Sequence, residues 1–181
     1  MPVHPSVLCL SPGSWPLRHS PPLAALDRLS RLMKEVYETT VRVRYAETDQ
    51  FGVVYYANFF VWFEVGRVEL LRQLGFTYKQ MELEDDCHIV VAEAHCRYLR
   101  PARYDDLFRI RTRIAEARSR TLRFAYEIVN DATGESLATG ETTHVVCDRD
   151  GRPKSLPAKY RKLFGPAHSA STVHKELFTD P

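Results

Sequence analysis

Residues 45–76 read YAETDQFGVVYYANFFVWFEVGRVELLRQLGF, a polar loop that runs directly into a long apolar stretch. The segment Phe59–Leu74 contains no proline, and its second half spaces apolar residues as one helix face does, so we predict a single long helix. Gly75 follows, where a C-terminal capping glycine is expected. The first turns carry bulky apolar side chains in every direction, which predicts a helix buried all round. These side chains are Phe59, Phe60, Val61, Trp62, Phe63 and Val65.

The rest of the chain is typical of a sheet that wraps such a helix. Runs with alternating apolar and polar residues predict five strands at Val36–Tyr45, His88–Arg100, Leu107–Ala115, Thr121–Asn130 and Ser136–Asp148. Thr77–Asp86 has helical potential, and Pro157–Phe164 predicts a short terminal helix. Short turns between consecutive strands favour antiparallel pairing. The predicted class is therefore α+β, an antiparallel five-stranded sheet around one long central helix.

Composition excludes several classes of function. The net charge of +2 provides no strong attraction for nucleic acid. No apolar run approaches the roughly 20 residues needed to span a bilayer, so no membrane insertion is expected. The four cysteines (Cys9, Cys87, Cys96 and Cys147) form no CxxC pair. Free thiols in a cytoplasmic protein, with no zinc site and no disulfide framework, are the expectation.

The two ends of the chain differ from its middle. Residues 1–32 are rich in proline, and their first acidic residue is Asp27. They lack the charged start and long apolar core of a secretory signal. We interpret them as a disordered extension or as a mis-assigned start, with translation beginning at Met33. Residues 33–164 are the predicted domain, and 165–181 a flexible C-terminal tail.

The loop motif resembles a known signature. Tyr45-x-Glu-Thr-Asp49-x-x-Gly52-x-Val-x-Tyr56-x-Asn58 is similar to the motif of 4-hydroxybenzoyl-CoA thioesterase-like proteins. With Phe63-Glu64 and Arg67-x-Glu69, the stretch looks most like their Tol-Pal-associated acyl-CoA thioesterase branch. The resemblance covers Val36–Phe164 and implies the hotdog fold.

The resemblance also implies roles for two residues. Asp49 matches the catalytic carboxylate, and the backbone N–H of Tyr56 matches the group that polarises the thioester carbonyl. Many members of the Tol-Pal branch have histidine where Tyr56 stands, whereas the hydroxybenzoyl type has tyrosine. The acyl group is therefore left open between short-chain and aromatic.

Elementary chemistry supports these roles. A thioester carbonyl gains negative charge when it is attacked, and free N–H groups in the first turn of a helix stabilise an anion. Asp49 precedes that turn, so it can attack the carbonyl and form a mixed anhydride, or deprotonate a water. The sequence leaves both routes open. The structural alternative is that Asp49 caps the loop and that Gly52 merely turns it.

Other residues have less specific roles. We predict that Gly52, Val54, Tyr55 and Asn58 contribute to substrate binding. Asn58 is expected to cap the helix, with orientation of the loop as the alternative. Glu64 is a reserve candidate for the catalytic carboxylate, and we predict that it instead forms a structural pair with Arg67.

Histidines and arginines on the predicted strands are the remaining candidates. His88, His95 and His144 have no metal-ligand spacing, so they are interpreted as scattered strand positions. Arginines 109, 111 and 113 alternate along one strand and predict a solvated sheet face, with a CoA phosphate contact as the alternative. Arginines 97, 100 and 103 flank Pro101 near a strand end, and we predict that the pantetheine-phosphate arm of CoA passes there.

The sequence thus predicts a cytoplasmic acyl-CoA thioesterase that needs no metal and no other cofactor. Acyl-CoA is the expected partner. The resemblance implies a homodimer whose sheets join edge to edge, or a homotetramer, with active sites at the dimer interface. One alternative is a hotdog dehydratase that acts on acyl-carrier protein, although the aspartate loop carries no histidine to act as its base. A non-catalytic acyl-binding hotdog protein is the other.

Overall fold

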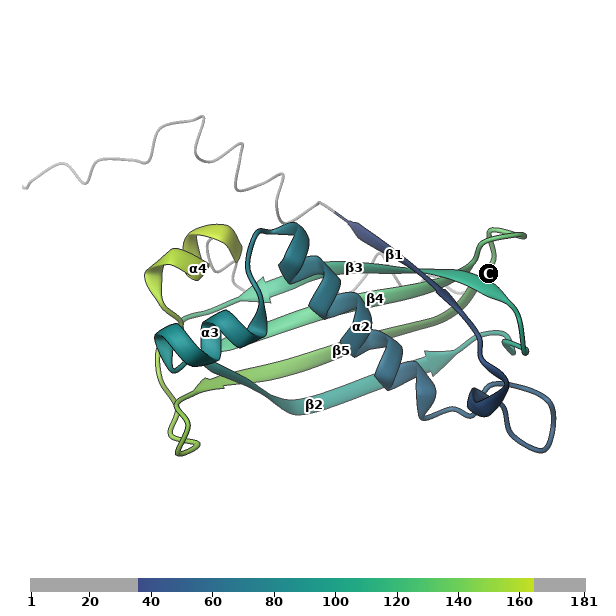
Figure 1. The fold of residues 1–181 in the computed structure, drawn as a ribbon, viewed down its shortest axis with the longest axis horizontal. Coiled ribbons are helices and arrows are strands. Elements are labelled where there is room, and N and C mark those ends of the chain that lie inside the picture. Colours follow the sequence, from purple (N-terminus) through teal and green to yellow (C-terminus); the bar gives the residue numbers. More distant parts are fainter. Residues whose placement is uncertain (1–35, 165–181) are drawn as a thin grey trace, which may run out of the picture.

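The computed structural model describes residues 36–164 (Figure 1). The predicted extension 1–32 and tail 165–181 lie outside these residues. The elements follow one another as β1 (Tyr37–Arg42), a short 3-10 turn η1 (Tyr45–Glu47), α2 (Asn58–Gln73), α3 (Tyr78–Asp85), β2 (His88–Tyr98), β3 (Leu107–Ala117), β4 (Thr121–Asn130), β5 (Ser136–Cys147) and α4 (Ala158–Phe164).

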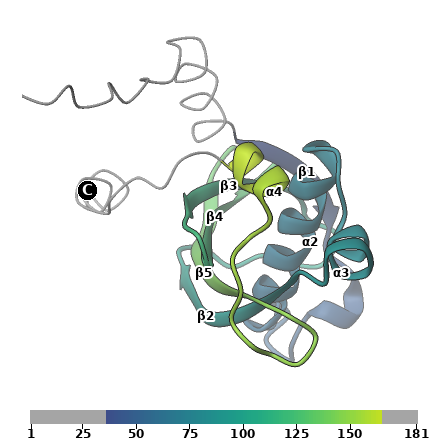
Figure 2. The same cartoon turned by 90° about the vertical axis from the view of Figure 1, so that its left-hand side faces the viewer.

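The five strands form one antiparallel sheet in the order β1-β3-β4-β5-β2. Consecutive strands β3, β4 and β5 pair along nearly their whole length, while β1 pairs with β3 and β2 with β5. Helix α2 lies across one face, and the sheet curls around it (Figure 2). The predicted α+β class, with a five-stranded antiparallel sheet around one long helix, is therefore confirmed.

Helix and sheet approach most closely at two glycines. A side chain at Gly66 of α2 would overlap the Thr112 hydroxyl, and its Cβ would lie 2.7 Å from Ile110 Cγ2. At Gly140 of β5, a Cβ would overlap the ring of Phe63. Because each glycine admits the opposing element, α2 is held against the sheet near its middle.

The prediction that α2 is buried all round is wrong. Val61 is 50% exposed and Glu64 is exposed, because the sheet covers only one side of the helix. The inward face carries Phe59, Trp62, Phe63, Gly66, Arg67, Leu70 and Leu71. The end of the helix is as predicted, since Gly75 adopts a φ of +92° and donates its N–H to the Arg72 carbonyl oxygen at 2.9 Å.

The predicted pair between Glu64 and Arg67 is also wrong. Arg67 turns into the core, is 8% exposed, and donates to the hydroxyls of Tyr78 at 2.6 Å and Tyr126 at 3.2 Å. Its guanidinium also lies over the rings of Tyr78 and Phe124. Side chains three residues apart on a helix meet only if both follow its surface, and this arginine does not.

A chain of buried hydroxyls continues from Arg67 into the sheet. Tyr126 and Thr142 share a hydrogen bond of 2.7 Å, and Thr142 shares one of 2.8 Å with His144 Nε2. His144 is fully buried, its Nδ1 has no partner among the described residues, and its ring meets Phe124 edge-on. His144, which the sequence analysis interprets as a scattered strand position, is thus part of the core.

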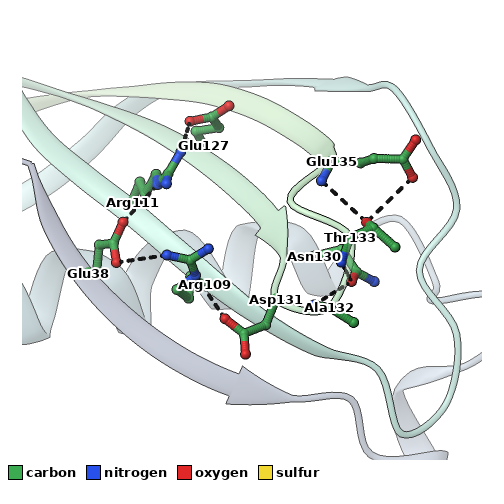
Figure 3. A network of polar contacts seen from close by, with 9 residues as sticks. All are labelled: Glu38, Arg109, Arg111, Glu127, Asn130, Asp131, Ala132, Thr133 and Glu135. Atoms are coloured by element: carbon green, nitrogen blue, oxygen red, sulfur yellow. Dashed lines mark hydrogen bonds and ion pairs between the residues drawn. The ribbon is translucent and has the colours of Figure 1, made fainter.

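The three predicted arginines of β3 lie on the sheet face that points away from α2. Arg111 bridges Glu38 and Glu127 (Figure 3), at 2.8 Å and 3.3 Å respectively. Arg109 bridges Glu38 at 3.4 Å and Asp131 at 2.9 Å. Because carboxylates already pair with these two arginines, the structure favours the solvated-face interpretation over a phosphate contact.

Candidate active site

The aspartate loop is held in shape by its own backbone. Asp49 N donates to the Val53 carbonyl oxygen at 2.8 Å, and Gly52 N donates to the Asp49 carbonyl oxygen at 2.9 Å. Gly52 adopts a φ of +70°, a left-handed conformation that favours glycine. Gly52 therefore makes the turn that the sequence predicted for it.

The carboxylate of Asp49 is half-buried and only partly engaged. Its Oδ1 accepts the Phe51 N–H at 2.8 Å, which fixes the direction of the side chain. Among the described residues, no hydrogen bond uses its Oδ2. One carboxylate oxygen therefore remains available to a substrate or a water.

One carbonyl ties this loop to the start of α2. The Glu47 carbonyl oxygen accepts both the Tyr55 N–H at 2.9 Å and the Asn58 side-chain amide at 2.8 Å. The capping role predicted for Asn58 is wrong, because Ala57 is the N-cap residue and no side chain caps it. Asn58 instead orients the loop, as the alternative interpretation held.

The Glu47 side chain also holds this loop, through hydrogen bonds from Arg44. Its carboxylate is buried and accepts the Arg44 backbone N–H at 2.7 Å and the Arg44 guanidinium at 2.8 Å. Burial raises the pKa of Glu47, but the bonds from Arg44 outweigh it and leave that pKa below its ordinary value. Glu47 is therefore held as an anion.

The helix start itself presents a free donor. Tyr56 N–H takes part in none of the hydrogen bonds found among the described residues, whereas the Tyr56 carbonyl oxygen accepts the Phe59 N–H at 3.3 Å. An N–H in this position points away from the body of the helix at its N-terminal end, where the helix dipole is positive. This is the group that the resemblance assigned to carbonyl polarisation.

A cleft of about 430 Å³ brings these groups together. Its lining includes Asp49, Val54, Tyr55 and Tyr56 of the predicted residues. Gly52, Asn58 and Glu64 do not line it within this chain: the first two shape and tether the loop, and Glu64 points outward from α2. The remaining lining residues are Val53, Phe59, Tyr98, Leu99, Arg100, Pro101 and Ala102.

Two of the arginines predicted to flank Pro101 lie at or near the cleft. Arg100 lines the cleft, and Arg103 approaches the Gly52 carbonyl oxygen at 3.5 Å, so a CoA phosphate contact there stays a prediction.

The three predicted strand histidines do not meet. His88 lies 3.4 Å from Asp86, His95 is exposed and His144 is buried. Within residues 36–164, no three His, Cys, Asp or Glu side chains are grouped as metal ligands. No helix in that range is long and apolar enough to cross a membrane.

Sequence reasoning missed two residues that shape this site. The sequence analysis gives Glu47 no role beyond its place in the motif, although its spacing of three from Arg44 is that of a capping box. Tyr98 was read only as part of a strand, yet its ring lines the cleft beside Phe59, 5.1 Å away between centroids. Its place at a strand end, three residues before Pro101, is the signal that was available.

Comparison with known proteins identifies the family of this chain. Residues 43–164 match the thioesterase-like superfamily. The chain is 36% identical over 135 residues to the putative acyl-CoA thioesterase YneP of Bacillus subtilis, covering 75% of this chain and 94% of that protein. It is 35% identical over 123 residues to the acyl-CoA thioester hydrolase YbgC of Escherichia coli, covering 67% and 90%.

Solved structures agree with the sequence relatives. The DHNA-CoA thioesterase of Staphylococcus aureus superimposes with a TM-score of 0.64 at 31% identity, over 67% of this chain and 80% of that one. The expected hotdog architecture is thus confirmed. By the match over most of its described residues and by these relatives, the chain belongs to the thioesterase-like superfamily of hotdog proteins.

Proposed function

We propose that this protein is an acyl-CoA thioesterase that converts acyl-CoA and water into a free carboxylic acid and CoA. The observation that carries the proposal is that Asp49 lines the same cleft as Tyr56, whose N–H takes part in no hydrogen bond among residues 36–164. Members of the same superfamily are named as thioesterases. A nucleophile or base and an anion-stabilising donor are the two groups that hydrolysis of a thioester requires.

In this reaction the thioester carbonyl oxygen would accept the Tyr56 N–H. Charge that develops on that oxygen is stabilised by the N–H and by the positive end of α2. Asp49 Oδ2 then attacks the carbonyl carbon, or removes a proton from a water that attacks it. In the first route the C–S bond breaks to leave an anhydride between the acyl group and Asp49, and a water then hydrolyses this anhydride to the free acid and the Asp49 carboxylate. In the second route the water adds directly to the carbonyl carbon, and the C–S bond breaks to give the free acid. In both routes the sulfur leaves as the CoA thiolate and takes up a proton that the water has given up.

The walls of the cleft support an aromatic or short acyl group. Tyr55, Tyr56, Phe59 and Tyr98 provide flat apolar surfaces, and aromatic rings pack favourably edge-to-face at such spacings. The acyl group therefore lies against tyrosine and phenylalanine rings, and the CoA arm leaves past Arg100.

A second copy of the chain completes the site in this proposal. β2 is an edge strand of 11 residues whose side chains are mostly exposed, with Val90 54% and Val91 50% exposed. A long, apolar, unpaired edge invites pairing with another strand. Tyr98 and Leu99, at the end of this strand, line the cleft, so an edge-to-edge dimer would place a partner beside the substrate. A cytoplasmic location and a tetramer remain predictions.

A panel of acyl-CoA substrates, short-chain and aromatic, tests the activity. Asp49→Asn keeps the acceptor for the Phe51 N–H but removes the charge, so turnover should fall by about 100-fold or more with little change in melting temperature. Glu64→Gln is the matched control, because it removes an exposed carboxylate of α2 that does not line the cleft.

The outcomes separate the alternatives. Normal turnover in Asp49→Asn together with inactive, folded Glu64→Gln would transfer the chemistry to the helical glutamate. An unmodified protein that binds acyl-CoA without hydrolysing any thioester would instead be an acyl-binding protein. Hydration of an enoyl carrier-protein thioester would favour the dehydratase, although no histidine within residues 36–164 lines the cleft.

A further inference from the structure

Tyr98 contacts the backbone that leads into α2. It is the last residue of β2, and its hydroxyl donates to the Tyr56 carbonyl oxygen at 3.1 Å. Its ring stands edge-on to those of Tyr56, at 6.5 Å between centroids, and Phe59, at 5.1 Å. The end of the edge strand is thus joined to the residues that lead into α2, at the cleft that Asp49 also lines.

This hydrogen bond constrains one particular peptide. The Tyr56 carbonyl and the Ala57 N–H belong to the same peptide unit, which is planar and trans, so the two groups point in opposite directions. The carbonyl is held by the Phe59 N–H at 3.3 Å and by the Tyr98 hydroxyl at 3.1 Å. With the carbonyl fixed from two sides, the Ala57 N–H is fixed in the direction that leaves the helix.

Like the Tyr56 N–H, the Ala57 N–H has no hydrogen-bond acceptor among residues 36–164. Neither the Tyr56 N–H nor the Ala57 N–H takes part in a hydrogen bond among residues 36–164, and no side chain caps the helix. Two adjacent donors therefore point outward at the helix start. The second of them has its direction set by Tyr98.

We propose that Tyr98 is a positioning residue for thioester hydrolysis, which orients the Tyr56–Ala57 peptide so that Ala57 N–H acts beside Tyr56 N–H on the substrate carbonyl oxygen. The inference rests on the proposed function, because it concerns the same reaction at the same cleft. Tyr98 acts through the backbone, and its hydroxyl touches no reacting atom.

The protonation of Tyr98 suits this role. Partial burial, with smaller contributions from the neighbouring Cys96, raises the pKa of Tyr98 to about 12. The hydroxyl consequently keeps its proton at neutral and mildly alkaline pH and continues to donate to the carbonyl.

Steady-state kinetics of Tyr98→Phe test the proposal. This variant keeps the ring that lines the cleft and removes only the hydroxyl. Loss of a direct oxyanion donor costs about 100- to 1,000-fold in kcat. An indirect contact should cost less, so we expect kcat to fall about 5- to 30-fold while KM stays within about twofold. Tyr98→Met, a second variant without the hydroxyl, should show a kcat reduced at least as far.

Tyr104→Phe is the matched control, since Tyr104 is an exposed tyrosine that packs on Tyr45 and does not line the cleft. It should keep both kinetic constants. A merely structural Tyr98 would lower the melting temperature and leave kcat of the folded enzyme unchanged, and that result would overturn the proposal. So would unchanged kcat in Tyr98→Phe while Asp49→Asn is inactive. If the unmodified protein hydrolyses no thioester, the proposed function itself fails, which is a different outcome.

Discussion

The buried histidine gives the protein a stability that depends on pH. Burial of His144, followed by the positive charge of Arg67, lowers its pKa from the ordinary 6.5 to about 3. The folded protein therefore keeps His144 neutral over a range in which the unfolded chain binds a proton. Between these two values each unit of acidification favours the unfolded state by up to about 1.4 kcal/mol.

The sign and size of the effect follow from the two pKa values. The full contribution is present above pH 6.5, and it is lost progressively as the pH falls from 6.5 toward 3. Between pH 7.5 and 4.5, this one residue should lower the free energy of unfolding by about 2–3 kcal/mol. This is a large share of the total stability, which is only about 5–15 kcal/mol for a domain of this size.

Urea denaturation at pH 7.5 and 4.5, at fixed protein concentration, measures the effect. His144→Gln retains a polar group near Thr142 and cannot titrate, so its free energy of unfolding should fall less on acidification than that of the unmodified protein. Carboxylates such as Glu47, whose pKa is lowered, destabilise both proteins in acid and cancel in the comparison. His95→Gln, a change at an exposed histidine, is the matched control. Equal acid sensitivity of His144→Gln and the unmodified protein would refute the reasoning.

Two further predictions concern packing and assembly. Gly66→Ala should destabilise the protein by about 1–3 kcal/mol in urea denaturation, because overlap with Thr112 and Ile110 outweighs the gain of about 1 kcal/mol in helix propensity; a stabilised variant would show that α2 can move off the sheet. Light scattering coupled to size exclusion should give a dimer or tetramer, and Val90→Lys on the exposed edge should shift it toward monomer with loss of activity, whereas an active, monodisperse monomer would contradict the proposed interface.

The fold was largely predictable because its signals are local. Alternation along β3 and β4 marks strands wherever one face is buried and the other is solvated, and these strands have that environment. Gly75 ended α2 as expected. The error lay in the exposure of Val61, since composition does not say on which side of a helix the sheet lies. The direction of Arg67 was equally hidden, because its hydroxyl partners Tyr78 and Tyr126 are 11 and 59 residues away.

The site was predictable only in part, for a related physical reason. Asp49, Gly52 and Tyr56 lie within one short motif, so sequence proximity brings them together in space. Tyr98 reaches the cleft only because β2 lies at the sheet edge beside the start of α2, a neighbourhood that depends on the topology. Asn58 was misassigned because the same residue type serves as a helix cap or as a loop tether, and only the position of the Glu47 carbonyl decides between them.

The starts of helices α2 and α3 provide an internal comparison that bears on the proposed chemistry. Helix α3 begins away from the cleft and carries a full capping box, in which Thr77 and Gln80 satisfy the first N–H groups. Helix α2 begins at the cleft and has no side-chain cap at Ala57. A missing cap costs about 1 kcal/mol or more in stability. The cost is understandable if a substrate oxygen supplies the acceptor, because a permanent cap would occupy the N–H groups that the reaction needs. The uncapped start, the tether through Asn58 and the clamp from Tyr98 then form one arrangement, in which the backbone is held rigid while its donors are left free.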